Sequence, residues 1–390
     1  MSQWRFTRRS LAAVLISSIA GTGLAAVPEP PPPGYRPALD TTEGGLWAIM
    51  DQMEADVKVS PALVKDEALN AYVKKIVCDL AGPQCESLRL YIVEDPNNNA
   101  MTAPNGMVIV WTGLLLRVQS EAELAFVLGH EITHYLKRHS VTNFEKATNS
   151  AGTVRLLSVA TLGLAALPAL LIASGRFASY SRDQEREADA GGFDLVVGKG
   201  LDPRQGALFM TNIAAEREAS TNRRKDFPYL QSHPQPEERA ATIAKRASEP
   251  GPQASATMLG AETHRAAVAP HRGAWLEEEF NRGDFGQSIA MIGQLLKAEP
   301  SSAELRYYLG EAYRRRNAKG DLENATKAYQ EALAQGSAPS AAYRGLGLVS
   351  LKAGQNDAAR TAFEQYLSRE PQAQDREMVQ FYLTGIKGTP

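Results

Sequence analysis

Residues 120–136 form an apolar stretch whose N-terminal end is marked by a helix-capping pattern. Ser120 and Glu123 have the spacing of a capping box, which marks the N-terminus of a helix. Apart from Glu123, residues 122–128 are all apolar, so the segment lacks the polar stripe of a surface helix. The pattern therefore predicts a buried helix.

Two β-rich runs, at residues 88–93 and 107–111, precede this helix. A cluster of Asn, Pro and Gly separates them, which predicts a strand pair or a connected sheet edge. An edge strand beside the buried helix could hold an extended peptide by main-chain hydrogen bonds. The cluster is also compatible with a simple structural turn.

The C-terminal third carries an internal repeat of polar and apolar positions. Glycines recur at 283, 320 and 354, at intervals of 37 and 34 residues. The same two intervals relate the apolar positions Ile292, Tyr329 and Phe363, and also Leu296, Leu333 and Leu367. A period of about 34 residues is typical of tetratricopeptide repeats, which stack helix pairs into a curved solenoid with a concave binding surface. The alternative, a plain helical bundle, does not explain the shared register.

The chemistry begins with His130, Glu131 and His134, an H-E-x-x-H pattern on the predicted buried helix. Residues i and i+4 share a helix face, so both imidazoles can bind one metal ion. Zinc peptidases use this arrangement, in which the ion acidifies a water and the glutamate takes its proton. We therefore predict one zinc ion per chain, with Glu131 as catalytic base. Two histidines on a surface helix would be the alternative.

A third zinc ligand must come from elsewhere in the chain. His139 is about half a turn away from His130 around the helix, and we interpret it as a last-turn residue interacting with helix carbonyls. Glu185 and Asp189 share a face of a second predicted helix. One could bind zinc while the other orients a ligand histidine. An isolated acidic cluster would otherwise be a solvated helix face.

Two motifs resemble one family of zinc peptidases. Glu-x-x-Ala-Asp at 185–189 and Asn-Ala-x-x-x-Pro-x-Gly at 99–106 are similar to segments of the gluzincin family that contains the HtpX heat-shock protease and the CAAX prenyl protease. The resemblance implies that Glu185 is the third ligand and that Asp189 orients the ligand set. His233, followed by Pro234, resembles a His-Pro element near the active site of relatives. It could donate a hydrogen bond to the oxyanion, occupy the open zinc position in a latent state, or only begin a helix.

With its repeats, essentially the whole mature chain resembles periplasmic proteases of the beta-barrel assembly-enhancing type. The resemblance implies degradation of misfolded or stalled outer-membrane proteins and contact with the outer-membrane β-barrel assembly machinery through the repeats. A second hypothesis is a chaperone or adaptor for outer-membrane protein assembly with a latent or structural zinc site. A closed structural site would need a fourth ligand, for which His233 is the candidate.

The N-terminal residues, the two cysteines and an internal apolar segment bear on where in the cell the protein is located. Basic residues before an apolar run at 11–20 and small residues at 23–26 predict a cleaved signal peptide, residues 1–26, and hence a periplasmic protein. In that oxidising compartment Cys78 and Cys85 are expected to form a short structural disulfide. Residues 156–175 are uncharged and long enough to cross a bilayer, but one crossing would separate His134 from Glu185. We expect a hydrophobic hairpin there, and peripheral membrane contact through it stays open.

Composition sets the remaining bounds. With 390 residues, 44% of them hydrophobic and 22% charged, the chain is long enough for two or three globular domains. A net charge of −2 without a basic stripe argues against nucleic-acid binding. The predicted class is mainly α (α+β), a zincin-type domain with a small sheet followed by an α-solenoid. The predicted parts are the signal peptide, a proline-rich extended spacer at 27–40, the zinc metallopeptidase domain at 41–247, a linker at 248–272, and repeats with a capping helix at 273–390.

Overall fold

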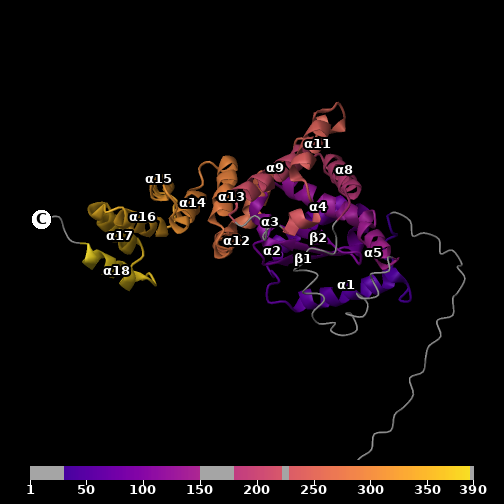
Figure 1. The fold of residues 1–390 in the computed structure, drawn as a ribbon, viewed down its shortest axis with the longest axis horizontal. Helices are drawn as coiled ribbons and strands as arrows, with labels where there is room; N and C mark the ends of the chain where they lie inside the picture. The colour runs from indigo at the N-terminus through magenta and orange to yellow at the C-terminus, as the bar shows by residue number, and fades with distance from the viewer. Residues whose placement is uncertain (1–29, 150–179, 222–227, 387–390) are drawn as a thin grey trace, which may run out of the picture.

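The computed structural model describes residues 30–149, 180–221 and 228–386. The predicted signal peptide and the apolar segment 156–175 lie outside these ranges. Helices dominate, and those of the N-terminal part pack around a small sheet near the N-terminal end of the described chain (Figure 1). Within the described ranges, no helix combines the length and the apolar character needed to cross a membrane.

The two predicted strands pair, and a third strand joins them. Strands β1 (Arg89–Val93) and β3 (Met107–Trp111) run parallel, and β2 (Ala100–Thr102) pairs antiparallel with β3. The order β1-β3-β2 puts β2 at an edge. Most of the Asn, Pro and Gly cluster forms the connections on either side of β2, but its Ala100–Thr102 section is the edge strand itself.

Successive side chains of β3 face opposite sides of the sheet, and both sides are buried. Met107 and Ile109 pack with Met50 and Met53 of helix α1 (Thr42–Val59). The intervening β3 residues join the larger core formed with α2 (Glu67–Ala81), α3 (Thr112–Arg117) and α4 (Glu121–Leu136). The sheet is therefore a buried layer between α1 and the helix that carries H-E-x-x-H.

Helix α4 is the predicted buried helix. Ser120 Oγ accepts the Glu123 N–H, and a Glu123 carboxylate oxygen accepts the backbone N–H of Gln119 at 2.7 Å. The helices that follow are α5 (His139–Asn149), α8 (Arg182–Gly198), α9 (Arg204–Ala219), α10 (Pro228–Ser232) and α11 (Pro236–Ser248). A disulfide joins Cys78 of α2 to Cys85 of the short 3-10 helix η1 (Gly82–Ser87), as predicted.

The repeat region consists of paired helices that lead away from the sheet in a row (Figure 1). These helices are α12 (Ala261–Asn281), α13 (Phe285–Ala298), α14 (Ala303–Arg316), α15 (Asp321–Ala334), α16 (Ala341–Lys352), α17 (Asn356–Arg369) and α18 (Arg376–Gly385). Ile292, Tyr329 and Phe363, which share a register in the sequence, are all fully buried. This shared burial confirms the register of the repeats.

Two expected connections are more ordered than the sequence suggested. In the predicted linker 248–272, the 3-10 helix η3 spans Pro252–Ala254 and α12 begins at Ala261. Alanine is the strongest helix former, so the alanines there extend the helix rather than loosening the chain. The described part of the proline-rich spacer is not a free extended segment, since Gln84 Nε2 donates to the Pro31 carbonyl oxygen at 2.6 Å.

Candidate metal centre

The site forms where helices α4 and α8 cross. Gly129 of α4 and Gly192 of α8 allow the crossing to be close, because a Cβ atom built on Gly192 would lie 2.9 Å from the His130 backbone nitrogen. A side chain at either position would push the helices apart. The close crossing brings Glu185 on α8 next to His134 on α4, with Glu185 Oε1 3.5 Å from His134 Nε2.

Four side chains converge in this crossing. One ligand atom from each of His130, His134, Glu185 and His233 lies within 4.8 Å of all the others, and all four residues are buried. His130 Nε2 lies 3.0 Å from His134 Nε2, 3.1 Å from His233 Nδ1 and 3.7 Å from Glu185 Oε2. Glu185 Oε1 lies 2.9 Å from His233 Nδ1 and 3.5 Å from His134 Nε2. Ligand atoms of a tetrahedral zinc site, with bonds of about 2.0–2.2 Å, lie about 3.3–3.6 Å apart. The five distances, from 2.9 to 3.7 Å, lie on both sides of this range, so small shifts of these side chains would fit them around one ion.

The partners of the two α4 histidines fix their tautomers. His130 Nδ1 lies 2.9 Å from Asp189 Oδ1, and because a carboxylate only accepts, Nδ1 carries the proton and Nε2 a lone pair. His139 Nε2 lies 3.2 Å from Glu187 Oε2, so it donates, and its Nδ1 accepts from His134 Nδ1 at 2.8 Å. Burial lowers the pKa of His134 well below its usual value, which keeps it neutral. The two Nε2 lone pairs therefore face each other, an arrangement that a cation between them stabilises.

Asp189 owes its position to a residue that the sequence analysis did not single out. Arg239, in the first turn of α11, donates to both Asp189 carboxylate oxygens at 2.8 and 2.6 Å, and its Nη1 lies 3.1 Å from Glu185 Oε2. Burial acts to raise the pKa of Asp189, but Arg239 outweighs it and lowers that pKa below its ordinary value. Asp189 is thus an ionised acceptor for His130. The signal available in the sequence was an arginine in the first turn of a helix that follows His233.

Glu131 lies beside the four-residue cluster rather than in it. Its Oε1 is 3.3 Å from His233 Nε2 and makes no hydrogen bond within the described part of the chain. Burial raises the pKa of Glu131, although the nearby imidazoles act against this. A carboxylate with a raised pKa is suited to taking up a proton near neutral pH.

His233 is the fourth side chain of the cluster. His233 lies in the loop between α10 and α11, and its ring stacks on Tyr229 with centroids 4.7 Å apart.

The interpretation of His139 as a last-turn residue of the zinc helix was wrong. Helix α4 ends at Leu136, and His139 begins α5, because Arg138 adopts a positive φ of 55° that ends the first helix. The His139 ring turns back to hold His134.

Two comparisons place this geometry among known proteins. Residues 63–247 match the sequence model of peptidase family M48, and residues 274–338 and 318–375 match that of the tetratricopeptide repeat. The chain is 25% identical over 269 residues to the beta-barrel assembly-enhancing protease of Escherichia coli K12, covering 64% of this chain and 54% of that protein. It is 27% identical over 271 residues to the protein of the same name from Yersinia pestis, covering 63% and 55%.

A third relative carries a different name. The mitochondrial metalloendopeptidase OMA1 of Schizosaccharomyces pombe is 29% identical over 172 residues, covering 44% of this chain and 50% of that protein. The chain spans about half the length of the curated relatives it matches.

The fold and the cluster define a metallopeptidase with a repeat domain attached. The peptidase part is an M48 domain, and tetratricopeptide repeats follow it. The predicted fold class, peptidase class and family resemblance are confirmed.

Proposed function

We propose that the chain is a zinc-dependent endopeptidase of the periplasm that hydrolyses misfolded or stalled outer-membrane proteins. The observation that carries the proposal is the convergence of two imidazole lone pairs and a carboxylate, with a second carboxylate alongside. Three nitrogen or oxygen donors that leave one corner for water are the donor set of catalytic zinc sites. The names of the bacterial relatives and the repeats support the outer-membrane clients and a docking role.

In this mechanism His130, His134 and Glu185 hold the ion, and Asp189 keeps His130 in the tautomer that exposes Nε2. When bound, the ion polarises the scissile carbonyl and acidifies a water. Glu131 takes the proton of the attacking water and delivers it to the leaving amine. The neighbouring His233 Nε2 is close enough to Glu131 to influence that transfer.

The test of the ligand set is Glu185→Ala. Removing one of three ligands should reduce bound zinc from about one per chain to a small fraction, because two imidazoles alone hold zinc poorly. Metal content after dialysis is measured by elemental analysis, together with casein cleavage with and without a chelator. The matched control is Asp183→Ala on the same helix, whose side chain is 93% exposed. Full zinc in Glu185→Ala would contradict the proposed ligand.

A second candidate function rests on the position of His233. Because its Nδ1 lies with the other three donors, His233 can complete a four-ligand site, as the chaperone or adaptor hypothesis requires. A peptidase whose fourth corner is filled by its own histidine would be latent until that histidine is displaced.

His233→Ala separates the two candidate functions. A latent peptidase should keep its zinc and become several-fold more active on casein, because the open corner becomes available to water. If His233 instead stabilises the oxyanion, the same variant keeps zinc and loses roughly 10²-fold in kcat. Loss of zinc without a gain in cleavage would favour the closed structural site, and unchanged turnover would rule out a catalytic or latency role. His271→Ala, a histidine of α12 outside the cluster, is the control.

A further inference from the structure

A small cavity adjoins the metal centre on the side of strand β2. His134 forms part of its wall, together with Thr102 at the end of β2, Trp47 of α1 and Val141 of α5. Its volume is about 10 Å³, close to the space that one water molecule needs. The cavity therefore begins at a proposed metal ligand and ends at the sheet edge.

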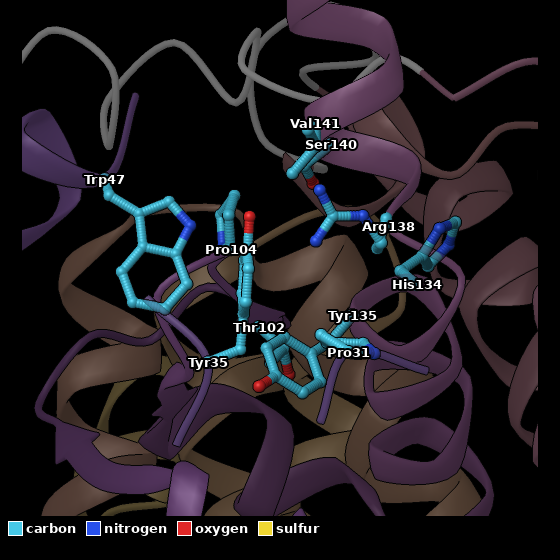
Figure 2. A pocket seen from close by; sticks show the side chains of 10 residues that line it. All are labelled: Pro31, Tyr35, Trp47, Thr102, Pro104, His134, Tyr135, Arg138, Ser140 and Val141. Carbon is cyan, nitrogen blue, oxygen red and sulfur yellow. The ribbon is translucent and has the colours of Figure 1, made fainter. Parts of the chain in front are cut away.

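The chain's own N-terminal segment closes this cavity. The Tyr35 ring stands between Trp47 on one side and Arg138 on the other (Figure 2). Its centroid is 6.0 Å from that of Trp47, at an interplanar angle of 84°, and the Arg138 guanidinium carbon is 5.4 Å from the ring. The Tyr35 hydroxyl donates to Glu43 Oε2 at 2.8 Å, which holds the ring in place. Without the Tyr35 side chain the cavity would be larger by about the volume of an aromatic ring.

Two of the residues that line the cavity each carry a buried polar atom without a partner among the described residues. Trp47 Nε1 and Thr102 Oγ1 are buried and make no hydrogen bond with any described part of the chain. Leaving a buried donor or acceptor without a hydrogen bond costs about 1–3 kcal/mol, so both of these unpaired atoms need an explanation. An indole N–H donor and a hydroxyl together fit an uncharged oxygen acceptor, such as a hydroxyl group.

Strand β2 supplies a way for a peptide to reach the cavity. Within the described ranges β3 is the one strand that pairs with β2, so the other edge of β2 is where an extended peptide could add as a further strand. Alternate side chains of an added strand point to the same face, so one of them would lie over the cavity beside Thr102.

We propose that this cavity is a subsite for one side chain of the peptide substrate, and that Tyr35 limits it to small, uncharged, hydroxyl-bearing or methyl-sized side chains. The one guanidinium on its wall does not select for anionic side chains, because Arg138 already pairs with Glu43 at 2.8 Å. Specificity at this position is therefore set by size and by the two unpaired polar atoms. The proposal rests on the peptidase activity, which cleavage by the wild-type chain checks separately.

The experiment compares cleavage-site profiles of wild type, Tyr35→Ala and Leu39→Ala on a peptide library read by mass spectrometry. Leu39 lies in the same segment, is 80% exposed and does not line the cavity, so Leu39→Ala is the matched control. In Tyr35→Ala, kcat/KM for large apolar relative to small side chains should rise roughly 10-fold or more at one position near the scissile bond. The profile should not change at the other positions.

A second variant leaves the shape of the cavity intact. Thr102→Val removes only the unpaired hydroxyl, so the preference for serine over alanine at the same position should fall, while cleavage at other sites continues. Fluorescence anisotropy of labelled peptides bound to Glu131→Gln chains carrying each substitution gives the same ranking without turnover. A Tyr35→Ala profile identical to that of Leu39→Ala, or faster cleavage at all positions alike, would overturn the subsite. No cleavage by wild type with an intact binding ranking would count against the proposed function instead.

Discussion

Glu131→Gln is expected to retain zinc and to lose roughly 10³-fold or more in kcat. The amide keeps the size of the side chain but cannot take the proton of the attacking water. Glu131 is not one of the four donors that lie within 4.8 Å of one another, so the ion should stay bound. Its burial raises the pKa of the carboxyl group, which suits a base working near neutral pH. Casein cleavage and metal content are measured on the same preparation.

The control for this experiment is Glu121→Gln, at the start of the same helix and outside the centre. It should cleave at the wild-type rate. Cleavage by zinc-loaded Glu131→Gln at more than about a tenth of that rate would show that another group takes the proton. Loss of zinc from Glu131→Gln would show instead that this carboxylate helps to hold the ion.

The parts of the site that the sequence predicted are those whose spacing along the chain is short and periodic. His130 and His134 share a face because they lie four residues apart on one helix, and the capping pair Ser120 and Glu123 marks where that helix begins. The repeat register was visible for the same reason, since each unit copies the last. Glu185 was found only because its local motif resembles that of a known family.

What the sequence did not predict depends on contacts between distant segments. Arg239 binds Asp189 across 50 positions of the chain, and no local pattern links the two. The three-residue strand β2 is too short to show an alternation of its own and exists because β3 lies beside it. The predicted linker 248–272 contains the start of α12, because its alanines favour a helix, whereas glycine and proline disfavour one.

Arg117→Met is expected to lower the free energy of unfolding by about 3–5 kcal/mol, because it removes the guanidinium that two buried carboxylates share. Arg117, on α3 of the peptidase domain, donates to Glu216 of α9 at 2.9 Å and to Glu279 of α12 at 2.8 Å. All three side chains are at most 3% exposed. The two carboxylates belong to the peptidase domain and to the first helix of the repeat region, so this ion-pair cluster joins the two parts of the molecule.

The measurement is urea unfolding of the full chain, followed by circular dichroism. The matched control is Arg186→Met, which removes ion pairs to Asp183 and Glu238 from a side chain that is 57% exposed and should cost less than about 1 kcal/mol. Neutralising the carboxylates as well, in Arg117→Met/Glu216→Gln/Glu279→Gln, should recover part of the loss, because neither position then carries a buried negative charge. A loss in the free energy of unfolding no larger than that of Arg186→Met would mean that the two carboxylates reach water or take up protons. The ion-pair cluster would then not be what holds the repeats to the peptidase domain.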